Sequence, residues 1–579
     1  MLSQKTLLRK AEPGPGEPGQ AVGFRERRTL WTWRFRGLVG TLLAVGVLRA
    51  PRLRAESPGA AVATENATAT RDAFSVLRAG GSAVDAAITA ALVAGITSPS
   101  SSGLGGGGFA LAYDAAEKKL RALDFRERAP RDLDPAPFEA RPLPPALRGA
   151  LVGVPGELLG LIELHQRGGR LPFSSLLERA EKRAREGFFV SPHLAKALTF
   201  GAEKVSQSPY LKALYYTGDK PAWVGKRQQN PRLAETLSRL KSQGKELFYE
   251  GAIAASLSKL AAAHGGRLTP EDFRDYRVIE REPLCRAFEG RRVCTMPAPS
   301  AGGLLLLEVL GLFPAETLRQ LGHGTPAYQH LLAEGMRGAL WDRMNYVGDP
   351  ALGAVDEAAL LDETRLAQRR ATIALDRTHT LPTFRQDEHG THHLVVRDRQ
   401  GNVVSLTTTV NRMFGAALAD EETGIVLNDQ LDDFTAQSAV LPLGLTESPN
   451  RPRPLARPVS SMTPTLVFEG DDVVAALGGS GGLAIGINVT EVLLASLVFG
   501  HSAKLAVSAP RFFVPLAGKT LLLEEEQATP ARLADLAFRG ELVGTMPKGS
   551  TAVQLITVKD GAVGAAADPR KFGEALTEP

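Results

Sequence analysis

The hydrophobic pattern divides the chain into a first part dominated by helices and a second part dominated by strands. Apolar residues recur with helical spacing over 61–93, where Gly80-Gly81 separates two predicted helices. Four consecutive glycines precede a strand predicted over 109–113, and such a run indicates that the backbone passes close to another segment. The clearest later helices are predicted over 157–166, 173–186, 253–264, 304–312 and 327–346.

At Thr391 the pattern changes to short apolar stretches separated by turn residues, which is typical of strands. The proline-rich stretch 435–458 is predicted to be an irregular surface loop. No internal repeat is present, so the sequence does not indicate a repeat architecture. Strands are predicted over 393–397, 403–410, 425–427, 464–468, 473–477, 520–523 and 552–558, with a helix over 487–499.

Composition is that of a soluble globular protein, with 44% hydrophobic and 23% charged residues among 579. Much of the net charge of +5 comes from arginines between positions 25 and 54. No later stretch combines dense basic residues with aromatics, so the sequence predicts no nucleic-acid partner.

Residues 1–58 are predicted to be a targeting segment rather than part of the fold. A basic stretch ending at Arg36 precedes an apolar run over 37–48, whose 12 residues suit a signal peptide and are too few to cross a bilayer. The protein is therefore expected to be exported, to the periplasm or the cell exterior. Retention of the segment as an uncleaved membrane anchor is the alternative.

The only two cysteines, Cys285 and Cys294, flank a predicted hairpin that turns near Glu289-Gly290. Cross-strand neighbours of this kind can form a disulfide, which an exported protein would permit. Two reduced, partly buried thiols are the alternative. The ten histidines show no ligand-like spacing, so neither a metal nor another cofactor is predicted.

The pair Gly390-Thr391 opens the β-rich part of the chain and suggests a specific chemistry. Cutting the chain before Thr391 would place a free α-amino group beside the threonine hydroxyl. An α-amine has a pKa of ~8, so one residue can supply both nucleophile and base at neutral pH. An ordinary hairpin threonine is the alternative, because threonine is common in strands.

Ser480 is a second candidate nucleophile, in the glycine-rich run 478–482 between a predicted strand and helix. A serine hydrolase with this motif needs an acid and then a histidine downstream, and His501 is the only later histidine. The arrangement argues against Ser480 as nucleophile. The backbone N–H groups of the glycine turn remain suited to an oxyanion hole.

Three further groups suit a substrate that carries a free amino-acid end. Arg126 follows a predicted strand, and arginine can bind a carboxylate through two parallel hydrogen bonds. The run 428–433 clusters amide and carboxylate side chains that can hold an ammonium group, and Ser460-Ser461 supplies two hydroxyls. Taken singly, each is more typical of a surface or structural residue.

Together, in this order and spacing, these motifs resemble the γ-glutamyltranspeptidases (glutathione hydrolases), a family of N-terminal-nucleophile hydrolases. The resemblance covers most of residues 59–570. The segments that carry it are 79–87, 101–109, 124–130, 296–303, 333–334, 342–343, 348–350, the Thr391 region, 424–434, 457–465 and 478–482.

The resemblance implies an α+β fold, a four-layer αββα sandwich built from two autoprocessed subunits. The precursor would cut itself between Gly390 and Thr391. A large subunit over 59–390 and a small subunit over 391–579 would then remain associated as a heterodimer, with both contributing to one αββα unit.

The resemblance also implies a reaction and its residues. Thr391 would attack the γ-glutamyl amide of glutathione or a similar donor, and Thr409 would orient it. Water, an amino acid or a dipeptide acceptor would resolve the resulting ester. The remaining implied residues are Gly481 and Gly482 for the oxyanion hole, Arg126, Ser460 and Ser461 for the α-carboxylate, and Asn411, Gln430 and Asp433 for the α-amino group.

Three positions depart from the family pattern. His392 follows the nucleophile where the family commonly has threonine, which bears on the rate of processing. Leu483-Ala484 follows the glycine pair where many members carry Ser-Arg. Leu443 stands before Gly444-Leu445 where an aromatic gate is common, which bears on access to the site.

Two other functions fit the same scaffold. One is a glutaryl or cephalosporin-type amide acylase, against which Asp433 argues because a glutaryl group lacks the amino group that Asp433 would pair with. The other is a non-catalytic secreted binding protein, against which the intact set of Thr391, Thr409 and the glycine pair argues.

Overall fold

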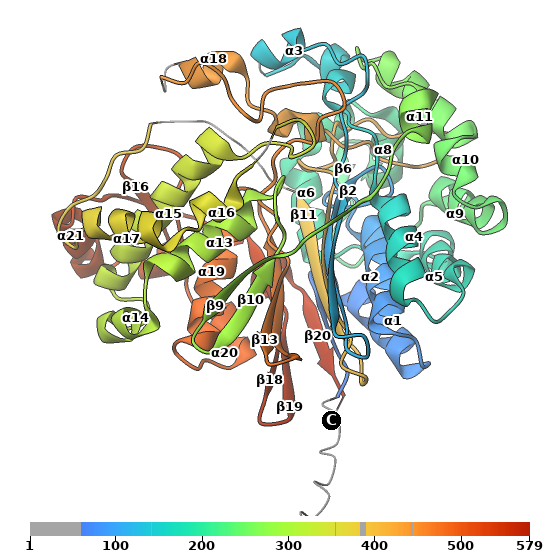
Figure 1. The fold of residues 1–579 in the computed structure, drawn as a ribbon. Coiled ribbons are helices and arrows are strands. Elements are labelled where there is room, and N and C mark those ends of the chain that lie inside the picture. Colours follow the sequence, from blue (N-terminus) through green and yellow to red (C-terminus); the bar gives the residue numbers. More distant parts are fainter. Residues whose placement is uncertain are drawn as a thin grey trace, which may run out of the picture. The chain divides into compact units, whose positions relative to one another are not determined.

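The computed structural model describes residues 59–140, 142–353, 355–382, 390–441, 444–549 and 551–578. The predicted targeting segment and Leu443 therefore lie outside the described residues. Two central β-sheets are stacked between two layers of helices (Figure 1), which confirms the expected α+β, αββα architecture.

Both sheets combine strands from either side of Thr391. Strands run in the order β20-β1-β11-β12-β2-β3-β8 in the first sheet and β19-β18-β14-β13-β10-β9 in the second. The first comprises β1 (Ala61–Thr64), β2 (Gly107–Asp114), β3 (Lys119–Phe125), β8 (Ile279–Arg281), β11 (Thr391–Arg397), β12 (Val403–Thr409) and β20 (Glu574–Thr577). The second comprises β9 (Leu284–Phe288), β10 (Arg291–Thr295), β13 (Thr465–Glu469), β14 (Asp472–Ser480), β18 (Ala552–Lys559) and β19 (Ala562–Ala566).

Helices cover the outer face of each sheet (Figure 1). Against the first sheet pack α1 (Ala67–Arg78), α2 (Ala83–Thr97) and α4 (Glu157–Gly168), while α5 (Phe173–Glu186) packs against α2 and α9 (Pro231–Gln243) against α5. Against the second pack α13 (Ala301–Leu312), α19 (Ala484–Leu497) and α20 (Ala503–Ser508), while α15 (Pro326–Tyr346) packs against α13.

Smaller elements complete the described chain. The helices are α3 (Ala136–Glu139), α6 (Pro192–Phe200), α7 (Ala202–Ser206), α8 (Pro209–Tyr215), α10 (Glu246–Tyr249), α11 (Ala252–Ala262), α12 (Pro270–Arg274), α14 (Ala315–Leu321), α16 (Glu357–Leu360), α17 (Glu363–Thr372), α18 (Gln437–Val440) and α21 (Pro530–Phe538). The strands are β4 (Phe188–Phe189), β5 (Tyr216–Thr217), β6 (Lys220–Pro221), β7 (Arg227–Gln228), β15 (Phe512–Phe513), β16 (Thr520–Glu524) and β17 (Leu542–Met546).

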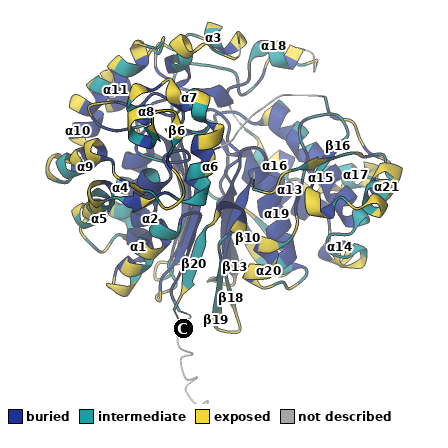
Figure 2. Cartoon of the chain, turned by 180° about the vertical axis from the view of Figure 1, so that it is seen from behind, coloured by how far each residue is buried: buried dark blue, intermediate teal, exposed yellow. Residues whose placement is uncertain are grey.

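Alternation along the central strands divides their side chains between two cores. In β11, Leu394 and Val396 join the core beneath α2 and α4, whereas Val395 joins the core that includes the space between the sheets. Every residue of β11 and β12 is buried, because both faces of this sheet are covered. Figure 2 shows buried sheets and helices that are exposed on their outer sides.

Two predicted elements were wrong. Residues 61–64 form strand β1 and not the start of a helix; they pair with β11 on one side and β20 on the other. A short buried apolar run has no periodicity that separates strand from helix, so only the pairing partners decide. Residues 425–427 form no strand but a single bridge between Ala419 and Val426, with Asn428 N–H donating to Gly105 O.

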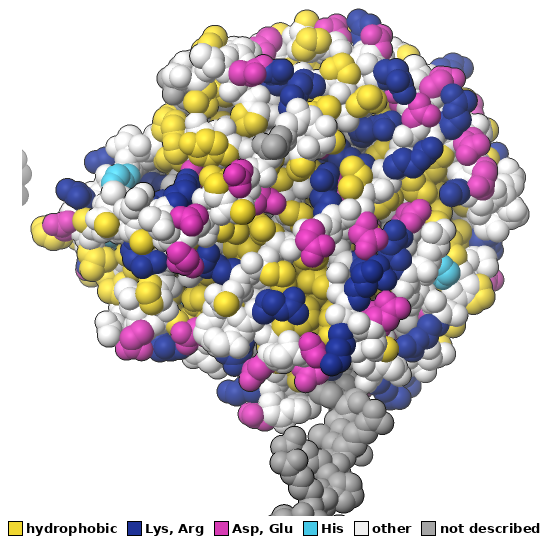
Figure 3. Space-filling view, viewed as in Figure 1, with side chains coloured by type: hydrophobic (Ala, Val, Ile, Leu, Met, Phe, Trp, Pro, Cys, Tyr) yellow, Lys and Arg dark blue, Asp and Glu magenta, His cyan; other side chains and the backbone are white. Residues whose placement is uncertain are grey.

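The surface of the described residues mixes charges of both signs. On the face seen in Figure 3, Lys and Arg side chains are interspersed with Asp and Glu. Within the described part of the chain, no single helix has the length and apolarity to cross a membrane; only the pair α13 and α14, bent by 79°, passes that test of length and composition together. Helix α13 is completely buried.

Candidate active site

Thr391 and Thr409 face each other across the antiparallel pair β11 and β12. Their hydroxyl oxygens are 3.4 Å apart, and Thr409 Oγ1 also donates to the Gly390 carbonyl oxygen at 2.8 Å. A threonine hydroxyl has one proton, so the Thr391 hydroxyl is the donor toward Thr409. Asn411 N–H donates to Thr409 Oγ1 at 2.8 Å, which fixes this hydroxyl between the Thr391 hydroxyl and the Gly390 carbonyl.

The run of four glycines lies directly against the end of strand β12 and against the segment at Val426. A Cβ on Gly106 would lie 1.9 Å from Thr409 O, and one on Gly105 would lie 1.9 Å from Val426 O. Neither contact is sterically possible, so these positions require glycine. The prediction that this loop passes close to another segment is confirmed, and that segment carries Thr409.

The glycine pair predicted for the oxyanion hole lies at the end of β14, the strand of the second sheet that packs against β11. Gly481 and Gly482 have φ of 121° and 61°, conformations that favour glycine. Lys571 Nζ donates to Thr391 O at 3.4 Å and also to Ser480 Oγ, so one lysine joins the glycine turn to Thr391. Ser480 is fully buried and accepts this hydrogen bond from Lys571.

Arg126 and Asp433 form a buried ion pair with an N–O distance of 2.5 Å, although they are 307 residues apart in sequence. Arg126 also donates to Pro458 O and Val459 O, both at 3.2 Å. Burial strengthens this pair because water does not screen it. A ligand with a carboxylate and an ammonium group can bind both members at once.

The other predicted binding residues surround this ion pair. Gln430 Nε2 donates to Asp433 at 2.7 Å, and its Oε1 is buried without a hydrogen-bond partner among the described residues. Ser461 Oγ accepts from Arg343 at 2.8 Å, and Ser460 Oγ accepts from Met462 N–H at 3.1 Å. Each serine hydroxyl therefore retains its own proton for donation to a ligand.

Asn411 connects the ion-pair region to the nucleophile. Its backbone contacts Thr409, while its side chain donates to Asp429 O at 3.0 Å. Its φ of 72° is uncommon for a residue other than glycine. Asn411 thus links Thr409 to the segment that carries Gln430 and Asp433.

The two histidines after the nucleophile are neutral and point to opposite faces of β11. Burial, with help from Lys571 and His193, lowers the pKa of His392 to about 3. Burial lowers the pKa of His393 as well, and its ring accepts or donates a hydrogen bond with Thr407 at 2.8 Å. A Cβ on Gly478 would lie 2.3 Å from the His393 ring, which explains one glycine of the 478–482 run.

Sequence reasoning missed Lys571 and Glu65. Lys571 forms a salt bridge with Glu65 at 3.2 Å, and Glu65 accepts from His393 N–H at 3.1 Å. Burial raises the pKa of Glu65 above its ordinary value, although Lys571 opposes this. Lysine is almost never fully buried unless it is paired, so a lysine near the C-terminus carried no local signal of this contact.

Beneath the glycine loop lie two buried carboxyl groups, Glu127 and Glu157. Neither oxygen of Glu127 has a hydrogen-bond partner among the described residues, whereas Thr408 donates to one oxygen of Glu157. Burial raises the pKa of each to about 8, and the charge of Glu127 contributes to the rise at Glu157. Both are therefore largely protonated at neutral pH.

The wild-type protein is expected to lose stability as pH rises, and Glu157→Gln is expected to make this loss smaller. The folded protein holds the Glu157 proton more tightly than the unfolded chain does, so stability falls as pH rises from 4.5 through about 8. For one carboxyl the loss is on the order of 3 kcal/mol. Urea unfolding midpoints at pH 5 and pH 9 measure it.

The matched control for this prediction is Glu163→Gln on the same helix. Glu163 is partly exposed and pairs with Arg167, so its replacement should leave the difference between the two pH values unchanged. An equal difference in wild type and Glu157→Gln would contradict a buried neutral carboxyl at this position.

Comparison with known proteins identifies the family of the chain. The family model described as gamma-glutamyltranspeptidase matches residues 69–577. A glutathione hydrolase proenzyme of Bacillus subtilis is 32% identical over 548 residues, covering 89% of this chain and 91% of the relative. One of Escherichia coli is 30% identical over 527 residues, covering 89% and 90%. The crystal structure of a cephalosporin acylase from Bacillus halodurans superposes with a TM-score of 0.80 at 25% identity, covering 93% of this chain and 99% of that one.

The αββα fold, with two threonines paired at the start of β11, defines the class of N-terminal-nucleophile hydrolases. Within that class, the chain belongs to the gamma-glutamyltranspeptidase family. Its members named above are hydrolases, and this chain is an enzyme of the same family.

Proposed function

We propose that the protein is a self-cleaving γ-glutamyl hydrolase and transferase acting on glutathione and similar donors. The observation that carries this proposal is the contact of Thr409 Oγ1 with both the Thr391 hydroxyl and the Gly390 carbonyl. It supplies a nucleophile, a residue that orients it and a polarised scissile carbonyl in one place. The glutathione hydrolases among the relatives support the donor.

In self-cleavage, Thr391 Oγ1 attacks the Gly390 carbonyl carbon, and the peptide bond is exchanged for an ester that water then opens. The Thr409 hydroxyl, 2.8 Å from the Gly390 oxygen, stabilises the negative charge that develops there. Large (59–390) and small (391–579) subunits would remain together, because each of the two sheets contains strands from both.

In the mature enzyme, Thr391 Oγ1 attacks the γ-glutamyl amide carbonyl while its freed α-amine accepts the proton. The N–H groups of Gly481 and Gly482 stabilise the tetrahedral oxyanion. Arg126 binds the donor α-carboxylate, and Asp433 with Gln430 binds its α-amino group. Water, an amino acid or a dipeptide then resolves the ester, giving hydrolysis or transfer.

The acylase alternative has one observation in its favour, the superposition on the cephalosporin acylase. A glutaryl group would present no ammonium to Asp433, which is buried and paired with Arg126. A glutaryl amide would thus present a methylene group to Asp433 where a γ-glutamyl donor presents its ammonium, which is costly for a buried carboxylate. This contrast favours a γ-glutamyl donor.

We also propose that the protein is exported. The bond between Cys285 and Cys294 supports this, because disulfides persist chiefly in oxidising compartments. Detection of the mature protein in periplasmic or culture-medium fractions tests it, and recovery only from the cytoplasm would contradict it.

Intact mass spectrometry of the purified protein, combined with release of the amine from a γ-glutamyl anilide, tests the proposed function. We expect two chains, the smaller beginning at Thr391, together with amine release. A chain that stays uncut after prolonged incubation, or a cut protein that releases a glutaryl anilide faster than the γ-glutamyl one, would refute it.

Gly390→Ala is expected to slow self-cleavage. A Cβ at this position would lie 2.4 Å from Asn411 O, and the φ of 148° is one that L-residues with a side chain rarely adopt. The close contact and the unfavourable φ each cost ~1–3 kcal/mol. The backbone is expected to shift to avoid them, and this shift moves the scissile carbonyl away from Thr409. The rate of self-cleavage, measured as the fraction of cut chain over time on a denaturing gel, should fall at least tenfold. Gly353→Ala, where nothing lies within 4 Å of the added Cβ, is the control and should process normally.

A further inference from the structure

The disulfide lies outside the candidate active site of Thr391 and Thr409, on the hairpin of β9 and β10. Cys285 and Cys294 are directly opposite in the strand register, and their sulfur atoms are bonded. Strand β9 is the edge of the second sheet. Cys285 is exposed there, whereas Cys294 is completely buried. Cys285 is therefore the member of the disulfide that lies at the surface, and Cys294 is closed to solvent.

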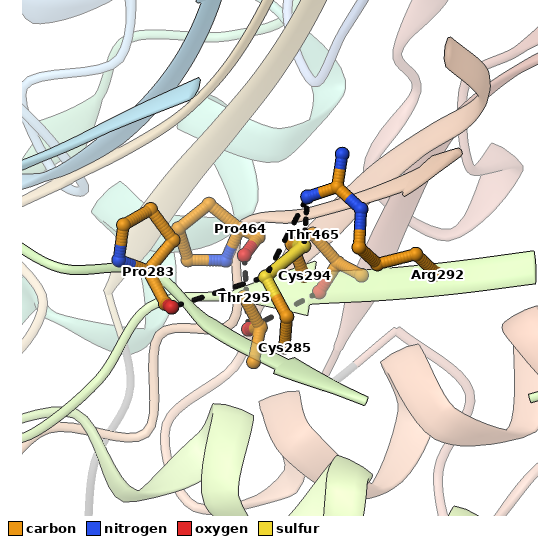
Figure 4. The surroundings of a disulfide bond; sticks show 7 residues. All are labelled: Pro283, Cys285, Arg292, Cys294, Thr295, Pro464 and Thr465. Atoms are coloured by element: carbon orange, nitrogen blue, oxygen red, sulfur yellow. Dashed lines mark hydrogen bonds between the residues drawn. A yellow bond between two sulfur atoms is a disulfide. The ribbon is translucent and has the colours of Figure 1, made fainter. Parts of the chain in front are cut away.

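Arg292 lies over the disulfide (Figure 4). Its Nη1 is 3.2 Å from Cys294 Sγ and 3.9 Å from Cys285 Sγ. Arg292 and Cys294 are two residues apart on one strand, so they share a face. The Phe468 ring, with its centroid 4.2 Å from the guanidinium carbon, packs against the same side chain and holds it in place.

Arg292 interacts electrostatically with Asp471, but Asp471 forms its salt bridge with Lys118. The other arginines of the hairpin are paired, Arg286 with Glu363 and Arg291 with Glu469. Among the described residues Arg292 forms no salt bridge. A positive charge beside a sulfur lowers the pKa of the corresponding thiol and makes the thiolate a better leaving group.

We propose that Cys285 is a site of thiol–disulfide exchange for small anionic thiols, with Cys294 as the leaving group. The incoming thiol loses its proton to solvent, and its thiolate attacks Cys285 Sγ. A mixed disulfide forms at Cys285 while the Cys285–Cys294 bond breaks, and Cys294 leaves as a thiolate beside Arg292. A second thiol then attacks the mixed disulfide, so that two thiols are oxidised to one disulfide and both cysteines are reduced.

Glutathione is a thiol of this class, because it carries two carboxylates and one ammonium group. The guanidinium of Arg292, which forms no salt bridge among the described residues, attracts such an anion over a neutral or cationic thiol. This exchange is separate from the γ-glutamyl chemistry, since it uses no residue of the active site. It can therefore be tested on protein that lacks Thr391, in which the proposed hydrolysis does not consume the reagent.

The test is a rate comparison on the full-length Thr391→Ala protein, with glutathione, 2-mercaptoethanol and cysteamine at equal thiolate concentration. Reactions are quenched with acid, and the adduct is located by peptide mapping. We expect the adduct on Cys285, and a rate with glutathione about tenfold above that with cysteamine that falls as salt is added. No adduct, an adduct on Cys294, or rates independent of thiol charge and salt would overturn the proposal.

Arg292→Gln is expected to slow adduct formation about tenfold, because the leaving thiolate loses its neighbouring charge. Arg291→Gln is the matched control: it removes an arginine from the same hairpin that pairs instead with Glu469, and should change the rate less than twofold. Equal rates in wild type and Arg292→Gln would refute the role of Arg292. The thiol-charge and salt comparison on unaltered Arg292 decides the proposal even if this variant fails to fold.

Discussion

Thr391→Ala is expected to leave the protein as a single chain and to abolish release of amine from a γ-glutamyl anilide. Alanine lacks the oxygen that attacks the Gly390 carbonyl in self-cleavage and the donor amide in turnover. Removal of a catalytic nucleophile costs roughly 10⁴-fold or more in rate. Intact mass and a steady-state assay on the same sample measure both effects.

Thr391→Ser shows whether the loss in Thr391→Ala comes from the missing hydroxyl or from a disturbed fold. Serine keeps the nucleophilic oxygen and the hydrogen bond toward Thr409, whose oxygen is 3.4 Å away. It should process and retain measurable turnover, because only a buried methyl group is lost. Amine release by Thr391→Ala within tenfold of wild type would exclude Thr391 as the nucleophile, whatever the state of the chain.

Asp433→Asn is expected to lower kcat/KM for γ-glutamyl donors by roughly 10²–10³-fold. The substitution keeps the shape of the side chain but removes the charge that faces the donor ammonium and Arg126. Truncating one partner of a buried, hydrogen-bonded charge pair costs about 2–5 kcal/mol. The loss should appear mainly in KM, since Asp433 binds the donor end that does not react.

The same variant discriminates between donors. A glutaryl anilide has no ammonium, so Asp433→Asn should leave its low turnover unchanged or raise it. The ratio of kcat/KM for the γ-glutamyl anilide to kcat/KM for the glutaryl anilide should therefore fall. Asp432→Asn is the control, because this neighbouring carboxylate pairs with Arg412 at 2.5 Å rather than with Arg126. Equal losses for both donors would mean that Asp433 supports the fold and not the choice of donor.

Motifs with local chemistry could be predicted from the sequence. In each of these motifs the reason for the residue type lies within a few residues of it, and is either the need for a nucleophile or a backbone conformation that favours glycine. The motifs are Gly390-Thr391, the glycine run before 109 and the glycine pair at 481–482. Long periodic helices were also predicted correctly, such as α5 (Phe173–Glu186). The hairpin of Cys285 and Cys294 was predicted, while their bonding was not decided, because it depends on the compartment and on cross-strand geometry.

Contacts between distant segments were decided only by the tertiary structure. Arg126 and Asp433 meet across 307 residues, and Lys571 reaches Thr391 across 180. Strand β1 is a strand because β11 and β20 lie on either side of it. The sequence by itself determined which residues can perform the chemistry. The tertiary structure decided which of them lie in contact, and burial there removes the water that would otherwise screen their charges and hydrogen bonds.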